Sequence, residues 1–217
     1  MRTWFCLSVI LGMIISVTCR AESPCPLLKR IGSFTRGSES SLAALVRFGS
    51  ENHISFGIES LASDPRPPIN TIPTETTAQA AILKIIGAPQ HYPLSCVNDV
   101  VLIRDDRVPT PMWLSRRIPT FRTPRVSLKL ASAALGDQLG SLLNPRQQGY
   151  AGSILDSIPP NLVGPFEIKA APVRYILCRL IAGSKGAVWV VPPTGESFAD
   201  SATVDTFWTI ILYPIGN

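Results

Sequence analysis

One cysteine, two histidines and two aspartates are the residues of this chain that could together perform covalent catalysis. Cys96 would supply a thiolate nucleophile, His53 or His91 would act as its base, and Asp99 or Asp105 would orient the histidine. Such a triad needs proximity in space rather than in sequence, so the separation of these residues along the chain does not exclude it. A thiol-dependent hydrolase is therefore the enzymatic alternative for this protein.

Other patterns that carry chemistry are weak or absent. The sequence contains no GxSxG, HExxH, GxxxxGK[ST], GxGxxG or EF-hand spacing. A zinc site would have to gather His91, Cys96 and distant ligands, since there is no CxxC pair. Asp105 and Asp106 are neighbours at the end of an apolar run, where adjacent side chains point apart, and this favours solvated carboxylates over a catalytic pair. We expect no catalytic residue, no cofactor and no metal ion.

Two groups of side chains could form a binding surface. Trp113, Trp189 and Trp208 could line a glycan platform, but two of them stand in apolar strand-like runs, which favours packing in a core. Five arginines between positions 105 and 125 could bind an anionic lipid, a glycan or a partner. Arginines spread over extended chain usually form a solvated surface, and the sequence favours that interpretation.

The first 21 residues have the pattern of a secretory signal peptide. Arg2 precedes an apolar run over 4–17, and small residues stand at Cys19 and Ala21 before a cut after Ala21. A transmembrane anchor needs about 20 apolar residues, and this run is shorter. A lipoprotein signal would use Cys19, but Ser16 stands where such signals usually carry leucine. We expect a periplasmic or secreted protein that begins at Glu22 and has no later segment able to span a membrane.

Composition indicates a folded protein and argues against nucleic-acid binding. Hydrophobic residues make up 46% of the 217 residues and charged residues 16%, while 20 prolines and 15 glycines suggest short elements joined by stiff turns. The net charge of +5 falls to +3 once Arg2 and Arg20 leave with the signal peptide. This excess is too small to indicate a nucleic-acid partner.

Three cysteines remain after cleavage, namely Cys25, Cys96 and Cys178. An exported protein can form disulfides, but three cysteines allow only one internal bridge. Cys25 lies in a leader over 22–39 that we expect to be flexible, and Cys96 could be a small core side chain. The sequence leaves open whether any two of them pair.

The range 40–104 predicts a first small module. Apolar spacing indicates a helix over 41–51 capped by Ser40 or Ser41, alternation indicates a strand over 53–59, and a second helix should start near Thr76 and stop at Gly87. An Asn98–Asp99 turn between two apolar runs predicts a hairpin over 92–103.

A second module is predicted over 126–217, beyond a linker over 105–125 that is rich in proline and arginine. Its expected elements are a helix over 127–143, a strand over 166–169, a helix that opens at Pro172 and ends at Gly183, and strands over 187–191 and 204–213. Both modules place amphipathic helices on a short mixed sheet, so the expected fold class is α+β.

The first module resembles the short N-terminal domain of secretins and TonB-dependent receptors. The resemblance covers about 40–104, less clearly 165–213, and lies in the segments SLAAL (41–45), ISF (54–56), IN (69–70), TTAQAAIL (76–83) and VVLI (100–103). In that family the domain binds proteins in the periplasm and carries no catalytic residues. The resemblance therefore implies a protein-interaction module. Because no barrel-forming segment follows here, we expect no transport or pore role.

Open strand edges are the expected means of binding. The extended piece over 69–72 and the strand over 204–213 are the candidate edges, because a small sheet leaves backbone groups unpaired. The candidate interface residues are Phe207, Trp208, Ile211 and Tyr213. The alternative, a central strand buried by helices, is favoured for 204–213 because both of its faces are apolar. We expect an exported envelope protein that binds an envelope protein or a second copy of itself without catalysis, with an envelope thiol hydrolase as the alternative.

Overall fold

The computed structural model describes residues 25–61, 71–87, 89–143, 153–155, 162–182, 186–191 and 209–211. Within these ranges the protein has the α+β fold expected from the sequence. Its helices there are α1 (Ser41–Asn52), α2 (Ala78–Ile86), α3 (Leu128–Leu143) and α4 (Val173–Ile181). Each helix begins and ends close to the range predicted from the spacing of its apolar residues. The signal peptide lies outside the described residues.

Side chains at the helix ends explain the limits of α1 and α2. The hydroxyls of Ser40 and Thr77 each accept a hydrogen bond from the backbone N–H three residues further on, as N-cap side chains do. α2 ends at Gly87, whose φ of 82° lies in the left-handed region and whose N–H donates to the carbonyl of Leu83. The hydroxyl caps and the glycine stop predicted from the sequence are therefore confirmed.

A six-stranded sheet forms the centre of the protein. Its strand order is β4 (Leu94–Val97), β5 (Val100–Ile103), β2 (Ser55–Ile58), β11 (Val188–Val190), β12 (Thr209–Ile211) and β8 (Ser153–Leu155). β5, β2 and β11 run parallel to one another, and β12 and β8 are also a parallel pair. β4 and β5 form the predicted hairpin, with positive φ at both turn residues Asn98 and Asp99. Because β2 pairs with β11, both halves of the chain contribute to one sheet.

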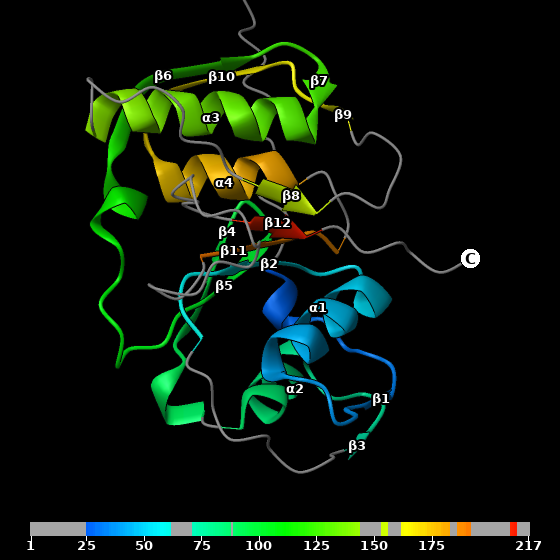
Figure 1. Cartoon of the computed structure of the whole chain (residues 1–217). Helices are drawn as coiled ribbons and strands as arrows, with labels where there is room; N and C mark the ends of the chain where they lie inside the picture. Colours follow the sequence, from blue (N-terminus) through cyan, green and yellow to red (C-terminus); the bar gives the residue numbers. More distant parts are fainter. Residues whose placement is uncertain are drawn as a thin grey trace, which may run out of the picture.

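Helices cover both faces of this sheet (Figure 1). On β5 and β11 successive side chains enter opposite cores, as the two-residue period of a strand requires. Val101 and Val188 pack in the core with α1 and α2, whereas Leu102 and Trp189 pack in the core with α3 and α4. The central strands are thus buried from two sides.

Gly57 on β2 makes room for the indole ring of Trp189. A Cβ atom at Gly57 would lie 2.4 Å from Cζ2 of Trp189 and 2.6 Å from Cδ2 of Leu102. Any larger side chain would displace the indole, which is fully buried. Trp189 is therefore a core residue, as expected, and not part of a glycan platform.

A disulfide joins the N-terminal leader to the central sheet. Cys25 is bonded to Cys96 of β4, with 5.9 Å between their Cα atoms and a sequence separation of 71. Cys178 is a buried free thiol, and its burial raises its pKa to about 12. The structure thus selects one of the pairings that the sequence left open.

The leader is folded onto α2 rather than flexible. β1 (Phe34–Thr35) pairs antiparallel with β3 (Thr71–Ile72), and Ile31 is buried in the core with α1 and α2. The guanidinium of Arg36 is also buried and donates to the carbonyl of Ile85 in the last turn of α2. The expectation of a flexible leader was wrong because its few inward-facing residues show no helix or strand period.

The range 105–125, expected to be a linker, contains the 3-10 helix η3 (Met112–Ser115) and the strand β6 (Arg117–Thr123). Ile118 and Phe121 of β6 are buried, whereas its arginines and Pro119 face solvent, which hid the strand pattern. β6 pairs antiparallel with β10 (Phe166–Pro172). This two-stranded ribbon lies beyond α3 and α4 from the central sheet (Figure 1). Smaller pieces complete the described elements: η1 (Pro26–Leu28), η2 (Pro89–His91), β7 (Val126–Ser127) and β9 (Leu162–Val163).

Candidate functional site

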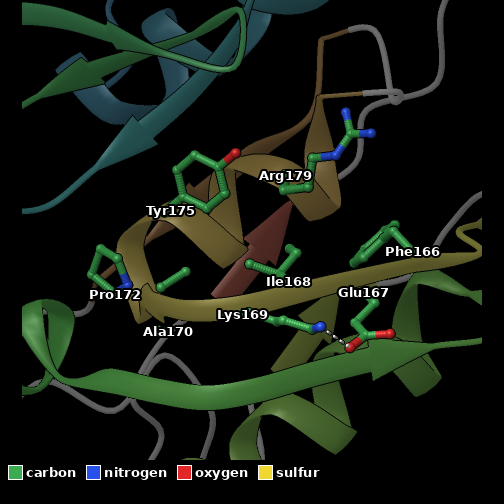
Figure 2. Close-up of a pocket in the computed structure, with 9 residues that line it drawn as sticks. Phe166, Glu167, Ile168, Lys169, Ala170, Pro172, Tyr175 and Arg179 are labelled. Atoms are coloured by element: carbon green, nitrogen blue, oxygen red, sulfur yellow. Dashed lines mark ion pairs between the residues drawn. The ribbon is translucent and has the colours of Figure 1, made fainter. Parts of the chain in front are cut away.

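A groove runs along β10 where this strand faces α4 (Figure 2). All seven residues of β10 line it, Tyr175 and Arg179 of α4 form the opposite wall, and it encloses about 450 Å³. The groove follows the edge of β10 that β6 does not occupy, because no residue of β6 lines it. In the part of the chain that the structure describes, β6 is the one strand paired with β10. The outer edge of β10 therefore offers backbone groups to a ligand.

An irregular residue in β10 shapes the groove. Ala170 has a φ of 47°, in the left-handed region that alanine rarely adopts, and the guanidinium of Arg117 donates to its carbonyl. Pro119 lies on β6 between Ile118 and Thr120, the partners of Ala171 and Lys169, and has no N–H to offer the ladder. The buried positions of β6 on either side are Ile118 and Phe121, three residues apart rather than two. The regular alternation of buried and exposed residues in the ribbon is therefore interrupted at this point. Residues from both faces of β10 line the groove.

The charged side chains at the groove are mainly cationic. Glu167 pairs with Arg122 of β6 at 3.2 Å and with Lys169 at 3.5 Å. The hydrogen bond from Arg122 is the main reason that the pKa of Glu167 lies below its ordinary value. Arg179 lies over the ring of Phe166, with 5.8 Å from its Cζ to the ring centroid. The groove lining thus carries one carboxylate and two cationic side chains, and the carboxylate is paired with Lys169 and with Arg122 on the neighbouring strand.

A second polar region lies at the carboxyl ends of the parallel strands, a place where open sheets often bind ligands. Glu59 follows β2, is buried, and accepts two hydrogen bonds from Arg174 of α4, one of them 2.9 Å long from Nη2. This ion pair joins the end of β2 to α4. The carboxylate of Glu59 is therefore already bound by a residue of the same chain.

Asp105, which follows β5, is similarly occupied. Its carboxylate accepts hydrogen bonds from Nε and Nη2 of Arg107 at 2.9 and 2.8 Å and from the hydroxyl of Tyr92 at 3.1 Å. The Arg107 side chain is the main reason that the pKa of this carboxyl falls from 3.8 to about 2. Asp105 therefore remains ionised and paired at neutral pH, which suits a structural role.

The residues proposed for thiol catalysis do not form a site in this structure. The sulfur of Cys96 is bonded to Cys25, so no thiolate is available there while the disulfide is intact. His53 ends α1 in the left-handed region, with a φ of 55°. His91 lies 3.3 Å from Asp106, measured from Nδ1 to Oδ1. Asp105 is buried and Asp106 exposed, so the two carboxylates point apart as expected.

The candidate interface residues fall mostly outside the described ranges. Phe207, Trp208 and Tyr213 lie outside these ranges, and their role as interface residues stays a prediction. Ile211 lies on β12, whose backbone pairs with β11 on one side and β8 on the other. Thr209–Ile211 is thus an interior strand, which agrees with the favoured alternative rather than with an open edge. The other expected edge is also partly occupied, because β3 pairs with β1.

The groove residues were missed in the sequence because each had an ordinary explanation. Val173–Ile181 was predicted as an amphipathic helix, and Tyr175 and Arg179 stand on its solvent side. An aromatic residue on the polar side of a short helix was the available signal. The predicted strand also ended at residue 169, so the irregular Ala170 was not predicted as part of it.

The described ranges contain no group of three or more histidine, cysteine, aspartate or glutamate residues placed to hold a metal ion. They also contain no helix of the length and apolar character that crossing a membrane requires.

No protein-family model matches the sequence, and neither curated proteins nor solved structures give a match.

Proposed function

We propose that this protein is an exported envelope protein that binds a polypeptide partner through the β10 groove and acts without catalysis. The observation that carries the proposal is the outer edge of β10, which lines a groove walled by Tyr175 and Arg179. A strand edge beside an aromatic and a cationic side chain suits recognition of an extended polypeptide. The resemblance of 40–104 to a periplasmic protein-interaction domain supports the same class of function.

The chemistry of the remaining polar residues supports binding rather than catalysis. Cys96 is held in a disulfide, and the buried carboxylates of Glu59 and Asp105 are each paired with an arginine. The Cys25–Cys96 bond also supports export, since such bonds persist mainly in oxidising compartments.

Capture of partners from exporting bacterial cells tests this proposal. The full chain would be tagged, fixed to its neighbours by a short-range chemical cross-linker, and purified. Replacing Tyr175 and Arg179 together by alanine should remove the captured polypeptides. A control that replaces Leu28 and Lys84, both exposed and remote from the groove, by alanine should retain them. Capture of the same polypeptides by both variants would contradict the proposal.

A further inference from the structure

We infer that the groove binds an acidic, extended segment, which adds to β10 as a further strand and places its carboxylates beside Lys169 and Arg179. The inference rests on the proposed function and adds to it the chemical class of the ligand. It follows from two features of the groove, the charge of its walls and the length of open strand edge along it.

The charges of the groove are unbalanced. Lys169 and Arg122 share the single carboxylate of Glu167, and the side chains of both cations are more than 70% exposed. Arg179 contacts the ring of Phe166, and within the described residues no carboxylate lies at ion-pair distance from it. A ligand with carboxylates would pair with Lys169 and Arg179, whereas a basic ligand would meet these two positive side chains and a carboxylate that is already paired.

The cations stand on both sides of β10. Lys169 extends along the strand toward Glu167, and Arg179 reaches over Phe166 from α4 (Figure 2). Side chains of an added strand alternate between its two faces in the same way. An acidic segment can therefore meet Lys169 on one face and Arg179 on the other.

The open edge has the length of a recognition motif. β10 spans seven residues, Phe166–Pro172, and its regular part before the left-handed Ala170, Phe166–Lys169, is about 13 Å of extended chain. A partner strand could form backbone hydrogen bonds along this part, and a longer segment would continue along the groove. Ile168 and Tyr175, which also line the groove, provide apolar surface that would contact the small or branched side chains of such a segment.

Two seven-residue probes test the ligand class with the full mature chain. One peptide carries two adjacent glutamates among valines, so that an added strand has one carboxylate on each face, and the other carries two adjacent lysines at the same positions. Binding of each is followed by fluorescence anisotropy at low salt. We expect the glutamate peptide to bind about tenfold more tightly, with an affinity that falls as salt is added. Methylation of alternate backbone nitrogens in this peptide should weaken binding about tenfold if it adds as a strand.

Charge reversal supplies the decisive variant. The double substitution Lys169→Glu and Arg179→Glu should make the lysine peptide the tighter ligand, whereas Lys84→Glu with Arg104→Glu, exposed positions outside the groove, should leave the preference unchanged. Circular dichroism would show that both variants fold.

Three results would overturn the inference: no preference between the peptides, an unchanged preference in the charge-reversed variant, or no binding of either peptide. In each case the capture experiment with the Tyr175 and Arg179 alanine variant still decides separately whether the groove binds a polypeptide. Failure of the ligand class is thereby distinguished from failure of the proposed function.

Discussion

Arg174 of α4 holds the carboxylate of Glu59 at the end of β2, although the two lie 115 positions apart in the sequence. The pair connects the two halves of the chain at the same sheet in which β2 pairs with β11. Because Glu59 is almost fully buried, its charge needs this partner. The orientation of α4, and with it of Tyr175 and Arg179, is thus coupled to the first half of the protein.

Removal of this partner should destabilise the fold. Arg174→Ala would leave a buried carboxylate without its arginine, and we expect the free energy of unfolding to fall by about 3 kcal/mol. Urea unfolding of the wild type and the variant measures this loss. The double variant Glu59→Met and Arg174→Met should recover most of the loss, since no unpaired charge then remains. An unchanged urea midpoint for Arg174→Ala would contradict the structural role of the pair.

The Cys25–Cys96 disulfide should be a large contributor to stability. It closes a loop with a sequence separation of 71 residues, so its reduction should lower the free energy of unfolding by about 4 kcal/mol in the chain-entropy account. Urea unfolding with and without reductant checks this. Reductant should have no effect on the variant Cys25→Ser and Cys96→Ser. Equal stability of the oxidised and reduced proteins would show that the bond does not hold the leader in place.

Asp105 should make stability depend on acid pH. The pKa of its carboxyl is about 2 in the folded protein and 3.8 as the ordinary value. A lowered folded pKa stabilises the protein above the ordinary value, and this contribution, about 2 kcal/mol, is lost as pH falls from about 4 to about 2. Unfolding free energies of the wild type and Asp105→Asn across this range test the point. The variant should be less stable than the wild type at pH 7, and its free energy of unfolding should change less as the pH falls below 4. Free energies that fall in parallel for the two proteins would contradict this prediction.

Gly57 should not accept a methyl group. Gly57→Ala would place Cβ against the buried indole of Trp189, and we expect a loss of about 1 to 3 kcal/mol. Gly32→Ala is the matched control, because no atom lies within 4 Å of the added Cβ there. Thermal unfolding of both variants tells them apart. If Gly57→Ala were as stable as Gly32→Ala, the close packing of β2 against Trp189 would be refuted.

The sequence predicted local elements well and long-range pairing poorly. Ser40, Thr77 and Gly87 act within a few residues of their helix ends, so their effects can be predicted from the sequence. The pairing of β2 with β11, by contrast, joins residues more than 130 positions apart, and no local period indicates it. The groove depends on the same kind of information, since Ala170 leaves the regular strand geometry and Tyr175 faces it only because α4 packs beside β10.

Site-specific photo-cross-linking from position 175 tests the central claim most directly. Tyr175 would be replaced by a photoreactive phenylalanine analogue in the full chain, in exporting bacterial cells, with the same analogue at exposed Lys84 as the control. The account predicts a covalent adduct with a partner polypeptide from position 175 and none from position 84. Mass spectrometry should identify an extended segment of that partner as the cross-linked site. No adduct from position 175, or the same adducts from both positions, would contradict the claim that the β10 groove is the binding site.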